Sequence, residues 1–394
     1  MTVTIAMVLL CVLPEIHILL EKYASRRRRR QAAPDAPPIK VVSLMIYPVK
    51  SCGGISVPEA MCTKRGFRHD RQWMVIYEAT GNMLTQRQVP KMALISPEVL
   101  SGPQVGGRQV EKILLVLKAP GMPIIEIPLI YKGGTIRDVR VWDDTCPGID
   151  QGDAAAAWLS KYMGSEAAEA AGSNPGGILS KLRLVWYPSD AKRPADSKYS
   201  PGAEAGAYSD GFPYLLVSNE SLKELNARLP KGVSPLPMNR FRPNIVVEGV
   251  ETPFAEDQWE RIRFIKAEDN HKHSSNPAYL NMHIVKPCSR CKIPTTDQKT
   301  GEQGRPTAGE SEAEPTRTLR EFRSGAALKL SNVKWRDEVF FGQNAVFSGA
   351  VRSRGWIDLR WLFGRLESNE ESRIIKVGHN AIVARKQSWV TWGM

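Results

Sequence analysis

The segment VVSLMIY at residues 41–47 runs directly into the turn PVKSCGG at residues 48–54, and this stretch indicates the fold class. A short apolar run that is ended by a proline and two glycines predicts a strand followed by a turn. Similar runs recur along the chain, bounded by Gly, Pro, Asn or Asp. They are QWMVIY (72–77), ILLVLK (113–118), PIIEIPLIY (123–131), RDVRVW (137–142), LRLVWY (182–187), NIVVEG (244–249) and IIKVG (374–378).

Helical patterns are fewer than strand patterns. The Ala-rich stretch Asp153–Met163 predicts one helix, and the periodic stretch Glu220–Leu229 predicts another, with Ser221 and Glu224 in the positions of a capping box. Many short strands without regular alternation with helices disfavour a doubly wound parallel sheet. The sequence therefore predicts a β-dominated α+β fold that contains a barrel.

The hydrophobic fraction of 42% is that of an ordinary globular protein. The length of 394 residues fits one large domain or two closely associated ones. The formal net charge is +13. Part of this charge lies in residues 1–30, where Lys22 and Arg26–Arg30 stand against Glu15 and Glu21. The remaining excess suits an anionic cofactor, an acidic protein partner or a membrane surface. No nucleic-acid-binding motif is present, so we expect no nucleic-acid partner.

The first 30 residues predict a membrane anchor. Residues 2–20 form an apolar run of nearly the length of a bilayer core, interrupted by Pro14, Glu15 and His17 and followed by the arginine block 26–30. A signal anchor, a cleaved presequence and an amphipathic extension on a membrane surface all fit this pattern. Because five arginines resist translocation, we favour an anchor with the body in the cytosol. Residues 31–39 then form a proline-rich linker.

Three polar or charged stretches predict insertions or linkers outside the core, namely 269–278, 297–315 and 348–372. The cysteines stand at positions 11, 52, 62, 146, 288 and 291, and only the last two have a regular spacing. This pattern is typical of reduced thiols in a cytosolic environment rather than of a secreted disulfide scaffold.

The pair Cys288 and Cys291 is the most reactive group of residues in the sequence. Arg290 and Lys292 provide a positive potential that favours thiolates, and thiolates are soft metal ligands. A zinc site would need two more ligands, and the nearby histidines at 271, 273 and 283 are irregularly spaced. A thioredoxin-like dithiol requires a βαβ pattern that is not visible here. Two interpretations of the pair remain: a thiolate that binds another metal, and two buried cysteines that bind nothing.

Three basic turns are further candidates. Lys50 and Ser51, ahead of two glycines, suit a phosphate or the polar edge of a pterin, or form an ordinary hairpin turn. Arg71 either binds a phosphate or pairs with Asp70. The stretch NRFRPN at 239–244 places two arginines and two asparagines at a strand start, where an ordinary basic turn is the alternative.

Six segments together carry a family resemblance: YPVKSCGG (47–54), DRQWMV (70–75), AYSDGFP (207–213), RFRPNIVV (240–247), CSRCKIPTTD (288–297) and VFFGQNAVF (339–347). In their order and spacing, the chain from Lys40 onward resembles the MOSC superfamily, in particular the mitochondrial amidoxime-reducing components. The resemblance implies a MOSC N-terminal β-barrel-like domain over residues 40–190 and a MOSC β-barrel domain over residues 191–394. It also implies anchoring in the outer mitochondrial membrane with the catalytic body in the cytosol.

The resemblance further implies a molybdenum cofactor (Mo-molybdopterin), with Cys291 as its catalytic metal ligand and Cys288 as a neighbour only. The positions that match the family's cofactor-binding residues are Lys50, Ser51, Arg71, Asp210, Gly211, Arg242, Asn244, Ser289 and Arg290. Separated cationic groups are what an anionic pterin phosphate requires. The chain departs from the family at Asn344, where an aromatic residue is usual, and at Gly211, where a hydroxyl residue is usual.

By resemblance, the chain reduces small N-hydroxylated substrates, amidoximes and hydroxylamines, with electrons from cytochrome b5 and an NADH-cytochrome b5 reductase. The alternative is a module that binds the cofactor or carries sulfur without substrate turnover, as in molybdenum cofactor sulfurases. We expect an enzyme rather than such a module, because the 39 residues ahead of the body are too few for the lyase domain of a sulfurase.

Overall fold

The computed structural model describes residues 38–101, 113–130, 133–265, 279–306, 309–347 and 374–386. The predicted anchor at 1–30 and the predicted insertions at 269–278 and 348–372 lie outside the described residues. Within the described ranges, no helix is both long and apolar enough to cross a membrane. The chain divides into residues 1–38 and 39–394, and the following description concerns the second unit.

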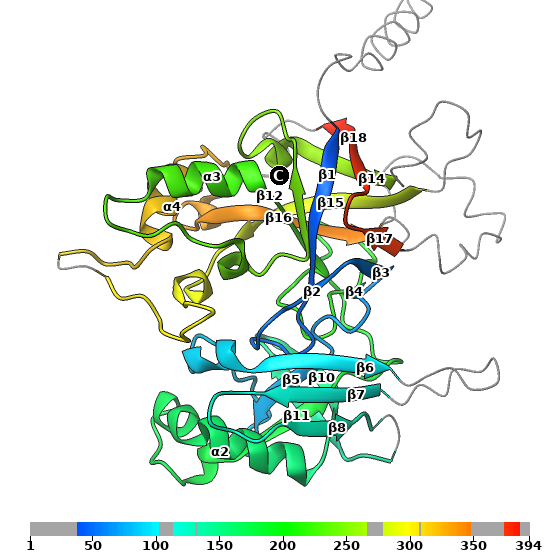
Figure 1. Cartoon of the computed structure of the whole chain (residues 1–394), viewed down its shortest axis with the longest axis vertical. Helices are drawn as coiled ribbons and strands as arrows, with labels where there is room; N and C mark the ends of the chain where they lie inside the picture. The colour runs from blue at the N-terminus through cyan, green and yellow to red at the C-terminus, as the bar shows by residue number, and fades with distance from the viewer. Residues whose placement is uncertain are drawn as a thin grey trace, which may run out of the picture. The chain divides into compact units, whose positions relative to one another are not determined.

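A closed barrel of seven strands dominates this unit (Figure 1). The strands pair in the order β13, β12, β16, β15, β14, β18 and β1, and β1 pairs with β13 to close the ring, while β2 extends the sheet beside β1. Their bounds are β1 Ile39–Ile46, β2 Ile55–Val57, β12 Tyr214–Ser218, β13 Ile245–Glu248, β14 Trp259–Ile265, β15 Tyr279–Ser289, β16 Phe340–Phe347 and β18 Asn380–Lys386. The first strand of the described chain thus completes a barrel whose other strands come after residue 213.

The barrel is closed around a hydrophobic core, because alternate side chains of each strand point inward. Buried core residues include Leu44, Val247, Trp259, Met282 and Phe340. Two helices, α3 (Asn219–Arg228) and α4 (Thr316–Arg323), lie beside each other along the barrel in Figure 1. They pack on a smaller cluster that contains Leu225, Leu319 and Phe341.

The predicted helix at 220–229 is confirmed, but its predicted capping box is wrong. The N-cap of α3 is Ser218, whose side chain accepts a hydrogen bond from the backbone N–H of Ser221. The Ser221 hydroxyl instead donates to buried Glu256 at 2.7 Å. The helix therefore begins earlier, at the end of β12, where Ser218 supplies the missing acceptor.

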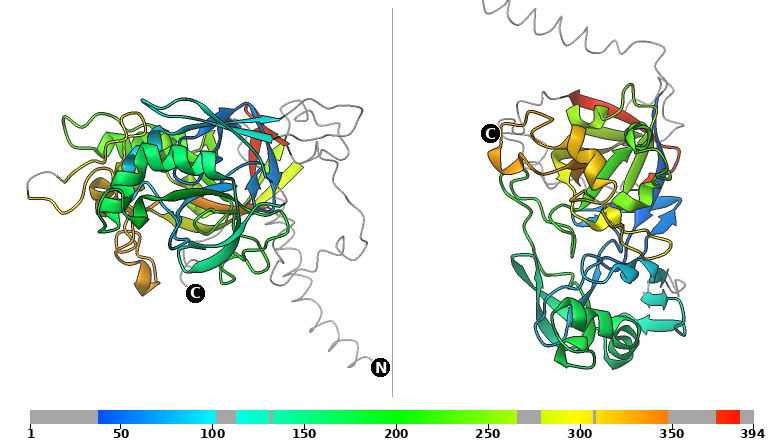
Figure 2. Two further views of the ribbon diagram at one scale, coloured as in Figure 1. Left: turned by 90° about the horizontal axis from the view of Figure 1, so that it is seen from below. Right: turned by 90° about the vertical axis from the view of Figure 1, so that its left-hand side faces the viewer.

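The chain between β2 and β12 builds two smaller sheets with α2 (Asp153–Ala170) packed on them. One sheet pairs β5 (Trp73–Tyr77), β11 (Leu182–Trp186), β10 (Asp144–Asp150) and β9 (Ile136–Val141); the other pairs β6 (Ser96–Ser101), β7 (Ile113–Lys118) and β8 (Ile125–Pro128). Seen from the barrel, α2 lies beyond these sheets in Figure 1 and in the side view of Figure 2. A third small sheet joins β17 (Ile374–Lys376), β3 (Glu59–Thr63) and β4 (Gly66–Phe67).

Short 3-10 helices complete the fold: η1 Pro90–Leu94, η2 Ile178–Ser180, η3 Met238–Phe241, η4 Ala255–Gln258, η6 Ile293–Thr295 and η7 Val333–Trp335. All eight strand segments predicted from the sequence contain a strand, so the prediction of a β-dominated, barrel-containing fold is confirmed. The helix predicted at 153–163 is longer and continues through Gly164 to Ala170. Gly164 allows this packing, because a Cβ there would lie 2.5 Å from the carbonyl oxygen of Ser180.

Candidate active site

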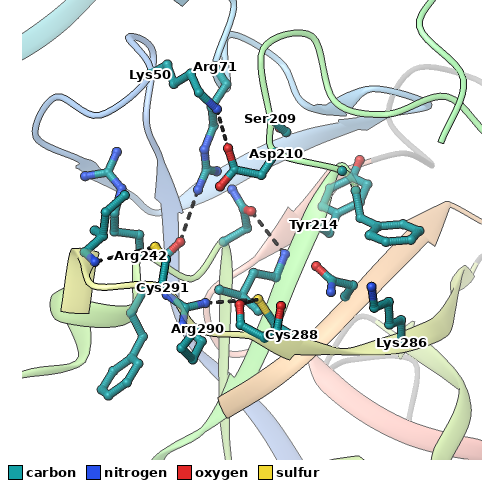
Figure 3. Close-up of a pocket in the computed structure, with 18 of the residues that line it drawn as sticks. Lys50, Arg71, Ser209, Asp210, Tyr214, Arg242, Lys286, Cys288, Arg290 and Cys291 are labelled. Atoms are coloured by element: carbon teal, nitrogen blue, oxygen red, sulfur yellow. Dashed lines mark hydrogen bonds and ion pairs between the residues drawn. The ribbon is translucent and has the colours of Figure 1, made fainter. Parts of the chain in front are cut away.

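A cavity of about 550 Å³ lies at one end of the barrel, where loops of the first half of the chain meet barrel strand ends. All ten site residues predicted from the sequence line it: Lys50, Ser51, Arg71, Asp210, Gly211, Arg242, Asn244, Ser289, Arg290 and Cys291. Figure 3 shows side chains from both halves of the sequence pointing toward one space. The fold thus brings together residues separated by up to 241 positions, from Lys50 to Cys291.

Lys50 and Asp210 form an ion pair at one side of the cavity (Figure 3). Lys50 Nζ lies 2.6 Å from Asp210 Oδ1 and donates to the carbonyl oxygen of Tyr208 at 2.7 Å. Burial lowers the pKa of Lys50, and Asp210 partly offsets this shift. Although desolvation raises the pKa of Asp210, the charges of Lys50 and Arg87 outweigh it and hold that pKa below its ordinary value. Trp142 Nε1 donates to the same carboxylate at 3.1 Å.

Arg71 and Arg242 form a second cationic group. Each guanidinium carbon lies 4.3 Å from the centre of the Tyr47 ring, and Arg71 donates to the carbonyl oxygen of Arg242 at 3.1 Å. Burial, reinforced by the charge of Arg71, lowers the pKa of Arg242 to about 10. Arg71 also pairs with buried Asp70, so it combines the two roles that the sequence left open: it pairs with the acid and still faces the cavity.

Four cavity residues have a left-handed backbone conformation. Their φ angles are 66° at Ser51, 50° at Arg71, 58° at Trp142 and 54° at Arg242. Non-glycine residues rarely adopt this region, and the described part of the chain holds only seven such residues. Backbone strain of this kind gathers at sites whose geometry must be fixed for function.

The segment Cys288–Cys291 turns at the end of β15 into the cavity. The Arg290 backbone N–H donates to the Val339 carbonyl oxygen at 2.8 Å, and its guanidinium donates to Cys288 Sγ at 3.1 Å. Cys291 Sγ accepts the Ile293 N–H at 3.5 Å. Both thiols are half-buried and line the cavity.

The five cysteines of the described part of the chain are free, as those of a reduced dithiol also are, and this part contains no group of three His, Cys, Asp or Glu side chains arranged for a metal. The candidate zinc ligands His271 and His273 lie outside the described residues.

Asn244 and Gly211 differ in how they meet the cavity. The buried Asn244 amide accepts from the Leu215 N–H at 3.2 Å and donates to the Met45 carbonyl oxygen at 3.1 Å, so it ties β12 to β1. Gly211 has open space within 4 Å of the position a Cβ would take. Gly211 therefore leaves room at the wall, while Asn244 fixes the wall.

The sequence interpretation missed several cavity residues, among them Arg87, Trp142, Ser209 and Lys286. Arg87 stacks on Trp142, with its guanidinium carbon 4.4 Å from the ring centre. The polar run TQRQ at 85–88 between two strands is the only sequence signal for Arg87, and the exposed Trp142 at a turn gives none. Proximity to Asp210, which lies 68 positions after Trp142, comes only from the fold.

The stretch 297–315, predicted as an insertion, contacts the cavity wall where it begins. Asp297 Oδ2 lies 2.7 Å from a terminal guanidinium nitrogen of Arg240 in an ion pair, and Arg240 does not line the cavity. Gln298 Nε2 donates to Gln86 Oε1 at 3.0 Å, and Gln86 Nε2 donates to the Ser51 carbonyl oxygen at 2.6 Å. The start of this segment thus supports the turn that carries Ser51.

Two protein-family models match the chain: the MOSC N-terminal beta barrel domain over residues 39–166 and the MOSC domain over residues 204–334. The chain is 34% identical over 328 residues to the "Mitochondrial amidoxime-reducing component 1" of Xenopus laevis, with 80% of each chain covered. It belongs to the MOSC-domain family of amidoxime-reducing components. The predicted resemblance is thereby confirmed.

Other members of this MOSC family match over a similar range. Identity is 33% over 306 residues to the "Mitochondrial amidoxime reducing component 2" of Bos taurus, covering 76% of this chain and 75% of the relative. It is 32% over 291 residues to the human "Mitochondrial amidoxime-reducing component 1", covering 72% of each chain. Strand β1, which opens the N-terminal MOSC match, pairs with β13 inside the second match, so the two matched regions share one barrel.

Proposed function

We propose that this MOSC protein binds a molybdenum cofactor in the cavity, with Cys291 as the thiolate ligand, and reduces N-hydroxylated substrates. One observation carries the proposal: a half-buried thiol stands in a cavity rich in positive charge. Six cationic side chains line the cavity, against the two acids Asp210 and Glu338. They are Lys50, Arg71, Arg87, Arg242, Lys286 and Arg290.

These residues fit a molybdopterin, which brings a phosphate, a polar pterin and a soft metal. Arginine and lysine side chains bind phosphate oxygens, and thiolates are the soft protein ligands. The Nε atoms of Arg87 and Arg290 are buried and have no hydrogen-bond partner among the described residues. A bound cofactor would offer acceptors to these two atoms; the Nε atoms of Arg240 and Arg261, outside the cavity, are also without a described partner.

The environment of the two thiols favours Cys291 as the ligand. Cys288 Sγ already accepts a charged hydrogen bond from Arg290 at 3.1 Å, whereas Cys291 Sγ accepts only a longer backbone N–H contact at 3.5 Å among the bonds of the described chain. We assign Cys288 to the orientation of Arg290. This agrees with the family pattern, in which the second cysteine of the motif is the ligand.

The other residues have supporting roles. Lys50, Arg71, Arg242 and Arg290 would hold the phosphate and pterin, and Ser51, Asp210, Gly211, Asn244 and Ser289 would form the surrounding polar wall. When bound, the cofactor would supply the two-electron reduction that cleaves an N–O bond and releases its oxygen as water. The protein's own task is to hold the group, orient it and balance its charge.

The proposal includes an electron donor and a location. We propose cytochrome b5 with its NADH-dependent reductase as donor, because acidic cytochromes and a chain of net charge +13 attract each other. The relatives are named mitochondrial, which supports a place on the outer mitochondrial membrane through residues 1–30. Domains over 40–190 and 191–394 belong to the same proposal, although β1 contributes to the barrel of the second.

The test compares two cysteine variants for molybdenum per chain and for benzamidoxime reduction with a chemical electron donor. Cys291→Ala should lose both, and Cys288→Ala should keep the metal. Equal loss of the metal from both variants would contradict a single thiolate ligand. Molybdenum binding by the wild type without reduction of any amidoxime or hydroxylamine would favour the carrier module instead.

A further inference from the structure

A second cavity of about 520 Å³ adjoins the first and shares Arg290, Cys291 and Glu338 with it. This volume is typical of sites for small organic ligands, which run from about 300 to 1,000 Å³. Its lining also includes Lys292, Ser311, Glu312, Arg320 and Asp337. Cys291 therefore stands in the wall between two chambers.

The two chambers differ in charge. The first has six cations and two acids, whereas the second has the three cations Arg290, Lys292 and Arg320 and the three acids Glu312, Asp337 and Glu338. In the second, Arg320 is neutralised by an ion pair with Glu312. A multiply charged anion is favoured by the first chamber and not by the second.

Glu338 is the acid best placed to meet a ligand beside Cys291. Its backbone is held on both sides of the Cα atom, because its N–H donates to the Trp335 carbonyl oxygen at 3.1 Å and its own carbonyl oxygen accepts from the Gly325 N–H at 2.9 Å. Its side chain is exposed, lines both chambers and forms no ion pair within 4 Å of any described residue, while the pKa of Arg320, raised first by the direct pair with Glu312, is raised further by the charge of Glu338.

We propose that the second cavity is the substrate chamber and that Glu338 selects substrates whose reduction yields an amidinium or guanidinium. This inference rests on the proposed function, since it assumes that the cofactor fills the first cavity. An amidoxime takes two electrons from the proposed donor and three protons from water, its N–O bond breaks, and an amidinium and water form.

The chemistry of this product explains the role of Glu338. A planar amidinium offers two parallel N–H groups to a carboxylate, in the same two-pronged way as an arginine side chain. The positive charge appears only as the reaction proceeds, so a carboxylate at this point stabilises late states more than the neutral substrate. Phenylhydroxylamine yields neutral aniline, and its reduction does not gain from Glu338.

The test measures benzamidine binding by calorimetry to the full chain, with molybdenum content measured on the same samples. Glu338→Gln should weaken benzamidine binding roughly tenfold, as expected for the loss of one charge-assisted contact. It should also lower kcat/KM for benzamidoxime by a larger factor than kcat/KM for phenylhydroxylamine. The matched control is Glu321→Gln, which removes one negative charge from an exposed position on α4 outside both cavities.

A second variant tests the chamber itself. Ser311 is exposed and lines only the second cavity, so Ser311→Trp should fill that cavity, raise KM for benzamidoxime several-fold and leave molybdenum content unchanged. Wild-type benzamidine binding in both Glu338→Gln and Ser311→Trp overturns the inference, as does a wild-type protein that binds no benzamidine. A wild type without molybdenum defeats the proposed function instead, and benzamidine binding reports on the chamber separately.

Discussion

Lys50 Nζ and Asp210 Oδ1 lie 2.6 Å apart in an ion pair with one buried and one accessible member, because the Lys50 side chain is 7% exposed and that of Asp210 is 54% exposed. The ammonium group is thus shielded from water, while its carboxylate partner faces the cavity. Burial lowers the pKa of Lys50, and Asp210 raises it again. The positive charge of Lys50 at the cavity wall therefore depends on Asp210.

We predict that Asp210→Asn weakens cofactor retention. Without the carboxylate, Lys50 loses its counter-charge and its pKa falls further, so the cation that would meet a phosphate is weakened. Loss of one partner leaves a buried charge unpaired, and because Asp210 is half exposed we expect a cost of about 1–2 kcal/mol in the free energy of unfolding. Urea denaturation and molybdenum content per chain measure the two effects.

Asp144→Asn is the matched control for this prediction. Asp144 is 52% exposed and pairs at 2.8 Å with Arg193, which is 3% exposed, and neither residue lines the cavity. Arg193 also donates to the carbonyl oxygens of Ser209 and Asp210, and Asp144→Asn leaves these two donors in place. It should lose similar stability and keep its molybdenum. If both variants lose molybdenum to the same degree, the effect of Asp210 is merely structural.

A second prediction concerns the left-handed backbone at Ser51, whose φ is 66°. This conformation costs a non-glycine residue about 1 kcal/mol, so Ser51→Gly should stabilise the cofactor-free chain by about that amount. It should also release the cofactor more readily, because the hydroxyl is lost and the turn loosens. Thermal denaturation and molybdenum content after dialysis check both directions.

Lys329→Gly provides the comparison, because Lys329 has a φ of 53° and is exposed away from the cavity. It should gain stability with no change in molybdenum retention. A Ser51→Gly protein that is less stable than the wild type would show that Ser51 has contacts worth more than its strain.

The sequence predicted strands from eight short apolar runs, but it missed the apolar strand β12 as well as strands that polar residues interrupt. Strand β15 contains Asn281, His283, Lys286 and Pro287, so no strand pattern is visible, although it carries Cys288 into the cavity. Strand β16 continues through Gly342, which has a φ of 80°. Their partners in the barrel provide the hydrogen bonds that the local sequence does not announce.

Prediction of the site had a similar limit. The ten predicted residues sit in the segments on which the family resemblance rests, and each of them lines the cavity. Arg87 and Trp142 reach the cavity only because β9, β10 and the loop after β5 come together in space, and Glu338 only because it precedes β16. Positions that depend on long-range folding carry no local signal that reasoning from one sequence can detect.

A third prediction concerns acid stability and His69, whose pKa is lowered to about 4 by burial and by the charge of Arg68. The folded state holds this histidine neutral, whereas the unfolded chain protonates it near its ordinary value of 6.5. Its contribution is therefore fully present above pH 6.5 and is lost as the pH falls toward 4, a change of up to about 3 kcal/mol.

The variant for this test is His69→Asn, since asparagine tolerates the φ of 68° found at this position. The difference in unfolding free energy between wild type and variant should shrink or change sign between pH 6.5 and pH 4. Carboxylates also titrate in this range, but they are common to both proteins. Two parallel stability curves over this window would rule out His69 as the source.

The last prediction concerns the ion pair between Arg323 on α4 and Asp257 at the end of η4, which are joined by two hydrogen bonds of 2.7 and 3.0 Å. Both residues are at least 97% buried, and Gln343 of β16 also donates to the same carboxylate. Arg323→Met should cost about 3–5 kcal/mol, because it leaves a carboxylate buried without its cation.

The double variant Arg323→Met with Asp257→Leu should lose much less than the sum of the two single variants, since an apolar pair needs no counter-charge. Urea denaturation of the four proteins yields this coupling energy directly. Additive losses would mean that the two side chains contribute independently and that Gln343 alone satisfies Asp257. Because α4 also carries Thr316 and Arg320 into the wall of the second cavity, a strong coupling would identify the buried pair as the support that fixes this wall against the barrel.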